Sequence, residues 1–342
     1  MAVHDLGKSG IMRFESGYYI IRQFMPYRSR LGGTNVFLID SADGWVVIDV
    51  GSDLETNRQV WQQVLKEVGI SFKQIQKIYI THCHPDHLGA ARWLQQRSEA
   101  PVYMLQEEIE RAYKYVFLDE NNFKQLYRQA ICSQLQQNKF PDNLTEQLIE
   151  DWFVEVRPQY LEPAEIIPLH EGDIIDLGGS PFKVMPAPAH TDGQYILWSE
   201  TRQHLFLADV LSADAYLHFT DWPNSNLSNP LEKLFELFDQ LKGLGTVKTF
   251  PGHGEVIEDL NDQMEKVKNR HLRALDRLEA AVQGPAAAGE LYSRLAPLED
   301  YVHHHRVVLG ETLGYLEYLV SRQRLIKKYE EDVALYLPVT KA

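Results

Sequence analysis

The sequence predicts an α/β fold with a smaller C-terminal appendage. Apolar, β-branched segments alternate with segments of helical periodicity between residues 34 and 105, which is typical of layered α/β architectures. Near residue 260 the pattern changes to charged helices followed by a short hairpin. The chain has 342 residues, of which 44% are hydrophobic, so it can build one large core and a second, smaller one.

The N-terminal third begins with three strands. Residues 34–40 and 45–50 are apolar and β-branched and flank an Asp-Gly turn, which predicts a hairpin. Residues 54–68 repeat apolar side chains at helical spacing, and residues 75–80 form a buried strand. The elements expected up to residue 105 are strands at 17–24, 34–40, 45–50, 75–80 and 101–105, and helices at 54–68 and 90–96.

Residues 106–152 are polar and helical in pattern and predict an insertion of two or three helices. Their aromatic side chains suit either a lid over a pocket or ordinary core, and the sequence leaves both readings open. Short strands return after the insertion. We expect strands at 166–169, 173–177, 182–185, 194–198, 204–207 and 247–250, and a helix at 231–241.

The C-terminal residues predict three helices and a hairpin. A charged helix over 260–282 is broken by Gly284-Pro285. The remaining elements are helices at 286–295 and 301–320 and strands at 325–329 and 333–337. We therefore divide the chain into a domain of residues 1–262, which contains the insertion, and a small winged-helix-like α+β domain of residues 263–342.

Charge and composition exclude several classes of protein. Lys and Arg total 34 against 48 Asp and Glu, and the net charge of −14 argues against duplex DNA or an anionic membrane as the main partner. No apolar run reaches 18 residues, so no transmembrane helix is expected. Cys83 and Cys132 are too few for a disulfide framework, and no signal peptide is visible, so a cytoplasmic location is expected.

A cluster of metal-ligand residues follows the strand at 75–80. The stretch His82-Cys83-His84-Pro85-Asp86-His87 holds three imidazoles and a carboxylate. In an extended loop His82 and His84 point the same way, whereas Asp86 and His87 stand where a helix is about to begin. Three further residues follow strand ends downstream: His190, Asp209 and His253. Nitrogen and oxygen ligands without thiolate suit zinc, with iron or manganese as alternatives.

These residues resemble the metallo-β-lactamase superfamily of hydrolases. The family motif His-x-His-x-Asp-His is His82, His84, Asp86 and His87 here, and the resemblance spans roughly residues 17–257. It implies a four-layered αβ/βα sandwich with two divalent ions at its edge. One ion would take His82, His84 and His190, the other Asp86, His87 and His253, and Asp209 would bridge both. The turn Ile48-Asp49-Val50-Gly51 is similar to the early Asp-x-Gly turn of the family, which makes Asp49 an orienting residue behind the His loop.

The resemblance also implies the chemistry. A hydroxide bridging the two metals would attack an ester, thioester or lactone of a small molecule, with Asp86 as the proton donor. Lactonase members carry Tyr three residues after the bridging Asp, whereas this chain has Ser212 there. Tyr216 or His218 could serve instead. Tyr27 precedes the Gly32-Gly33 turn, whose loop often borders the pocket in the family, and it is our third pocket candidate. Residues 209–221 contain no Lys or Arg, which disfavours glutathione thioesters.

Two other functions of the same fold stay open. A phosphodiesterase or ribonuclease is suggested by the basic cluster Arg322, Arg324, Lys327 and Lys328, although residues 263–342 carry a net charge of only +1. An iron-dependent thiol or persulfide oxygenase would need only three His ligands. We favour packing or homodimerisation over nucleic-acid binding for residues 263–342.

Overall fold

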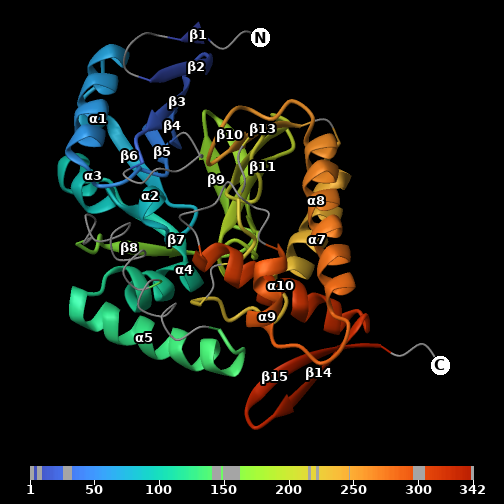
Figure 1. Ribbon diagram of the computed structural model, residues 1–342. Coiled ribbons are helices and arrows are strands. Elements are labelled where there is room, and N and C mark those ends of the chain that lie inside the picture. Colours follow the sequence, from blue (N-terminus) through green and yellow to red (C-terminus); the bar gives the residue numbers. More distant parts are fainter. Residues whose placement is uncertain are drawn as a thin grey trace.

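The computed structural model describes residues 4–5, 10–25, 33–140, 148, 162–214, 217–220, 223–245, 247–295 and 305–339. Two β-sheets pack face to face, and helices cover the outer face of each (Figure 1). The predicted α/β fold of four layers is therefore confirmed.

The first sheet holds eight strands in the order β1-β2-β3-β4-β5-β6-β7-β8. It is antiparallel from β1 to β5 and parallel from β5 to β8. Its strands are β1 His4–Asp5, β2 Ile11–Glu15, β3 Tyr18–Gln23, β4 Thr34–Ser41, β5 Gly44–Ile48, β6 Ile75–Tyr79, β7 Val102–Leu105 and β8 Ile166–Leu169.

The second sheet holds five strands in the order β13-β12-β11-β10-β9. Only β12 and β13 run parallel, whereas the other pairs are antiparallel. Its strands are β9 Ile174–Leu177, β10 Ser180–Pro186, β11 Tyr195–Ser199, β12 His204–Ala208 and β13 Lys248–Pro251.

Apolar residues fill the space between the sheets and beneath the helices. Phe37 of β4 packs against Phe206 and Phe250 of the second sheet. Outside the first sheet lie α1 Glu55–Val68, η1 Phe72–Gln74, α2 Pro85–Leu88 and α3 Ala91–Ser98, and outside the second lie α7 Pro230–Leu241, η4 Lys242–Leu244 and α8 Leu260–Ala281. Both helical layers therefore bury their apolar faces on a sheet.

The C-terminal elements are α9 Ala288–Leu295, α10 His305–Ser321, β14 Leu325–Glu330 and β15 Val333–Pro338. Leu316 and Tyr336 belong to the same core cluster as Leu205 of β12 and Phe238 of α7. The boundary predicted at residues 262–263 falls inside α8. The division into two domains and the winged-helix assignment stay predictions.

The helical insertion contains α4 Gln106–Arg111, the short π-helix η2 Ala112–Val116 and α5 Glu120–Gln137. Tyr127 and Phe140 are buried in the core, so these two aromatics do not form a lid. The insertion's remaining residues, including Trp152, lie almost entirely outside the described residues. Within the described part of the chain, no helix is both long and apolar enough to cross a membrane.

Candidate metal centre

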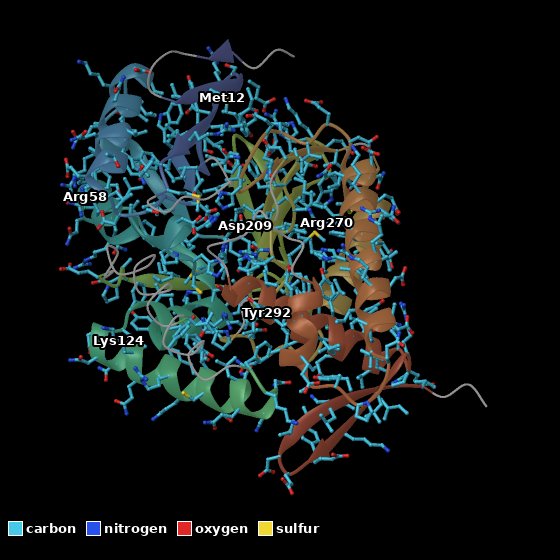
Figure 2. All side chains as sticks on the ribbon, viewed as in Figure 1. Met12, Arg58, Lys124, Asp209, Arg270 and Tyr292 are labelled. Atoms are coloured by element: carbon cyan, nitrogen blue, oxygen red, sulfur yellow. The ribbon has the colours of Figure 1, made fainter. Side chains whose placement is uncertain are left out.

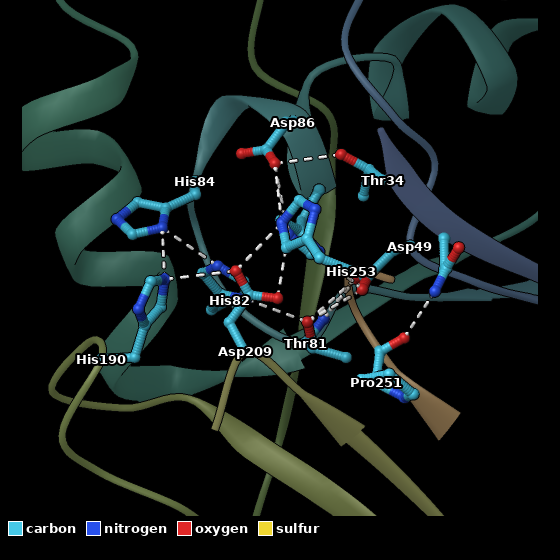
Figure 3. Close-up of polar contacts among 12 residues, drawn as sticks. Thr34, Asp49, Thr81, His82, His84, Asp86, His190, Asp209, Pro251 and His253 are labelled. Carbon is cyan, nitrogen blue, oxygen red and sulfur yellow. Dashed lines mark hydrogen bonds and ion pairs between the residues drawn. The ribbon is translucent and has the colours of Figure 1, made fainter. Parts of the chain in front are cut away.

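The seven predicted ligands come together where the two sheets meet (Figure 3). Pro85 occupies the first turn of α2, where its missing N–H costs nothing, and it starts the helix directly after His84. Asp86 and His87 therefore turn away from the extended residues before them. His190, Asp209 and His253 come from the loops that follow β10, β12 and β13.

The first ligand group is His82, His84 and His190. Nδ1 of His84 lies 3.1 Å from Nε2 of His82 and 3.0 Å from Nε2 of His190. All three ring nitrogens lie within 4.8 Å of one another. Three imidazoles from two distant loops thus point at one place.

The second ligand group is Asp86, His87 and His253. Oδ2 of Asp86 lies 3.5 Å from Nε2 of His87 and 3.3 Å from Nε2 of His253. The two imidazole nitrogens are 3.4 Å apart. All three side chains are buried.

Asp209 stands between the two groups. Its Oδ2 lies 3.4 Å from Nε2 of His190 in the first group and 3.2 Å from Nε2 of His253 in the second. Its Oδ1 lies 3.4 Å from Nε2 of His87. One carboxylate therefore contacts both ligand groups.

Asp49 contacts the His loop from behind. Its Oδ2 lies 2.8 Å from Nδ1 of His87, and its Oδ1 accepts a hydrogen bond from the backbone N–H of Thr81, also at 2.8 Å. The Thr81 hydroxyl contacts both Asp49 and Nδ1 of His82. These contacts turn Nε2 of both imidazoles inward, which is the usual arrangement around metal ligands.

Three further side chains hold the centre in ways that the sequence reasoning missed. Thr34 donates a hydrogen bond to Asp86 Oδ2 at 3.0 Å, and Gln194 accepts one from the Asp209 N–H at 3.1 Å. Thr81 could have been found from its position next to His82. Thr34 and Gln194 follow no motif, because only the folded chain brings them to the centre.

Charges of opposite sign are buried together here. Burial favours neutral Asp209, but the imidazoles of His253 and His87 outweigh it and hold the pKa of the Asp209 carboxyl well below its usual range. Burial likewise favours neutral His253, yet Asp209 and Asp86 raise its pKa to about 10. Burial and neighbouring imidazoles keep the pKa of His82 well below its usual value. The second group therefore attracts positive charge, and His82 offers a neutral lone pair.

This donor set fits metal ions. Neutral imidazole nitrogens about 3 Å apart attract one another only through a shared proton or cation. The Nδ1 atoms of His190 and His253 are each directed at a backbone carbonyl, of His218 and Gly33 respectively, which leaves Nε2 for a cation. Cys83 is buried in the core beneath the first sheet and stands outside both ligand groups, so the ligands are nitrogen and oxygen only.

Of the predicted pocket residues, His218 lies at the centre. Its ring centroid is 4.3 Å from that of His190, and both side chains line a narrow pocket. Arg270 of α8 also lines this pocket, and Figure 2 labels it together with Asp209. Tyr27 and Tyr216 lie outside the described residues.

Comparison with known families agrees with this geometry. The family model described as the metallo-β-lactamase superfamily matches residues 29–253, more than half of the chain. The chain belongs to the metallo-β-lactamase superfamily. The match begins before β4 and ends at His253, so it contains all seven ligand-type residues of the candidate centre.

Individual members of the superfamily resemble this chain over different lengths. The probable metallo-hydrolase YqjP of Bacillus subtilis is 22% identical over 316 residues, which cover 91% of this chain and 95% of that protein. The human acyl-coenzyme A thioesterase MBLAC2 is 37% identical over 101 residues, which cover 28% of this chain and 33% of that protein. A β-lactamase domain protein from Burkholderia ambifaria shares the fold, with a TM-score of 0.77, 21% identity and coverage of 98% and 97% of the two chains.

Proposed function

We propose that this chain is a dinuclear metal-dependent hydrolase of small-molecule thioesters, with esters and lactones as the neighbouring substrate classes. The observation that carries the proposal is the position of Asp209, whose two oxygens reach His190 on one side and His253 and His87 on the other. A carboxylate in that position suits a bridge between two cations. The similarity to a thioesterase over 101 residues selects the first substrate class to test.

Each ligand group would hold one divalent ion. His82, His84 and His190 would bind the first ion, and Asp86, His87 and His253 the second. When bound, such ions supply Lewis-acid activation of water at neutral pH. Zinc suits this nitrogen and oxygen donor set, and iron or manganese would also fit it.

The chain's own residues would orient the metal ligands and supply a proton to the leaving group. Asp49 and Thr81 fix the rings of His87 and His82, and Thr34 fixes the Asp86 carboxylate. Asp86 is the residue that we expect to return a proton to the leaving group. His218 stands beside the first group, where it would line the substrate pocket.

Ion pairs within the chain weaken the argument for a phosphodiesterase or ribonuclease, because they engage the basic cluster that suggested it. Arg322 pairs with Glu232 at 2.8 Å, Lys327 pairs with Glu317 at 2.6 Å, and Arg324 pairs with Asp276 and Glu279. Phosphate binding depends on basic side chains that are available to the polyanion. A complete second ligand group likewise favours hydrolysis over a single-iron oxygenase.

The test combines metal analysis with a substrate panel. We expect close to two divalent ions per chain, and hydrolysis of small, neutral or singly charged acyl thioesters above that of aryl esters, lactones and phosphodiesters. Asp209→Ala should lower this activity by at least about 100-fold, because it removes a contact from both ions. Glu200→Ala, a change of an exposed carboxylate, should leave it unchanged. One iron without a second metal, or turnover that survives in Asp209→Ala, would contradict the proposal.

A further inference from the structure

We infer that Glu108 is a positioning residue that fixes the two loops of the first ligand group relative to each other. Glu108 belongs to α4 in the helical insertion, outside every motif of the family resemblance. It is fully buried. The inference rests on the proposed metal-binding function and adds a residue to it.

One carboxylate holds both loops by their backbones. Oε2 of Glu108 accepts a hydrogen bond from the N–H of Cys83 at 2.7 Å, and Oε1 accepts one from the N–H of Gly193 at 2.9 Å. Cys83 lies between the ligands His82 and His84, and Gly193 lies three residues after His190. All three ligands of the first group therefore stand on loops that this side chain joins.

The chemistry of the contact requires a carboxylate. An ionised Glu accepts hydrogen bonds at both oxygens, whereas Gln accepts at one end and donates at the other. Because the two acceptors belong to one planar group, they fix the distance between the two N–H groups. In a Glu108→Gln variant, an amide NH₂ would face either Cys83 or Gly193, and one loop would have to move.

The surroundings show that the buried charge is balanced. Nε of Arg111, also buried, lies 3.4 Å from Oε1 of Glu108. The same guanidinium contacts Asp192 at 2.9 Å and donates to the carbonyl of Asn224 at 3.0 Å. Asp192 belongs to the His190 loop, so the ion pairs tie that loop to α4 a second time. A buried carboxylate without such partners would be strongly destabilising.

Gly193 provides independent evidence that the loop and α4 are held in close contact. A Cβ atom at position 193 would lie 2.7 Å from Cβ of Glu107 and 3.2 Å from Cγ of Glu108. Any side chain at 193 would push the loop away from α4. The close approach of the His190 loop to α4 and the hydrogen bond from this loop to Glu108 therefore both depend on Gly193.

The network continues into the helical insertion. Asn224 donates to the hydroxyl of Tyr127 at 2.9 Å, and Tyr127 is buried on α5. Figure 1 shows α4 and α5 below the first sheet, on the same side of the molecule. The insertion thus supports the candidate centre from beneath, in addition to any contact with substrate.

The experiment compares Co²⁺ binding by the parent chain, Glu108→Gln and Glu110→Gln. Glu110 carries the matched exposed carboxylate on α4, bonded to Gln106. We expect Glu108→Gln to bind one Co²⁺ about 10- to 100-fold more weakly, the usual cost of losing an orienting contact. At low Co²⁺, Glu108→Gln should lack the same visible absorption band that His84→Ala lacks. Glu110→Gln should have the Co²⁺ affinity and the absorption spectrum of the parent chain.

A purely structural role would give a different result. If Glu108→Gln binds both Co²⁺ ions with parental affinity and spectrum while only its melting temperature falls, the inference is wrong. If Glu108→Gln does not fold, Gly193→Ala takes its place, because it displaces the same loop and keeps the carboxylate. A parent chain that binds a single Co²⁺ would contradict the dinuclear proposal. The comparison of Co²⁺ binding between Glu108→Gln and His84→Ala would still test the role of Glu108.

Discussion

At the scale of single residues, Gly252 stands where a side chain would enter the candidate centre. A Cβ atom there would lie 2.2 Å from Oδ1 of Asp209 and 3.0 Å from Cε1 of His87. We predict that Gly252→Ala folds but displaces Asp209 and loses activity about 100-fold, because a shift near 1 Å is that costly in an active site. Metal content and the rate of thioester hydrolysis measure the effect.

Gly243 is the matched control for this change. A Cβ atom at Gly243 meets nothing within 4 Å, and its backbone lies outside the left-handed region. Gly243→Ala should therefore keep the parental metal content and rate. A Gly252→Ala protein with full metal content and full activity would show that the centre has more room than the distances indicate.

The ligands themselves could be predicted from sequence, whereas their supports could not. His82, His84 and their partners belong to residue types that bind metals, and each follows a strand that the apolar pattern reveals. Glu108 and Gln194 are ordinary polar residues in sequence. Their roles arise only when α4 and β11 bring them against the ligand loops.

At the scale of elements, most helices and strands follow from periodicity, and the exceptions have physical reasons. Strand β2 (Ile11–Glu15) was not predicted, because five residues that include Arg13 and Glu15 show no apolar run. It forms because β3 offers a backbone partner. Tyr127 looked equally suited to a lid, but α5 packs against the C-terminal elements and buries it.

Helices α8 and α10 meet through a buried histidine that makes stability depend on pH. His271 of α8 is buried, and its Nδ1 lies 2.8 Å from the hydroxyl of Tyr315 on α10. Burial, with a smaller effect of Arg270, lowers the pKa of His271 to about 3 from an ordinary 6.5. Below pH 6.5 the unfolded chain takes up a proton that the folded chain does not, so this contribution to stability is lost as the pH falls toward 3.

The contribution of His271 to the free energy of unfolding falls by about 1.4 kcal/mol for each pH unit below 6.5. We predict that His271→Gln is less stable than the parent at pH 7.5 but that the gap in melting temperature narrows or reverses at pH 5. His170→Gln, at an exposed site, should follow the parent at both values. A gap that stays constant between pH 7.5 and 5 would mean that His271 carries a proton when folded.

At the scale of the whole molecule, the acidic charge belongs to the N-terminal part. Residues 1–262 hold 22 basic and 37 acidic residues, and residues 263–342 hold 12 and 11. The excess of negative charge therefore lies in the part of the chain that carries the candidate centre, where two divalent ions would offset only part of it. An acidic field of this kind disfavours a polyanionic substrate. It leaves neutral or singly charged thioesters as the better candidates.

The two ligand groups also join the two halves of the sandwich. His82, His84, Asp86 and His87 follow β6 of the first sheet, whereas His190, Asp209 and His253 follow strands of the second. Each ion would therefore bind residues from both sheets. An ion that binds only the folded chain stabilises it by mass action, by about 2.7 kcal/mol at a hundred times its dissociation constant.

We predict that chelation lowers the melting temperature of the whole chain by several degrees, and that Zn²⁺ restores it. This fall in melting temperature should be larger than the effect expected from loosening one ligand loop. The reason is that the two sheets lose a link that spans their interface. Asp209→Ala should respond less to chelator and to Zn²⁺, since it has already lost the residue that contacts both groups. Melting curves of both proteins with and without chelator measure the difference. A parent chain whose melting temperature ignores the chelator would show that the two sheets hold together without the ions.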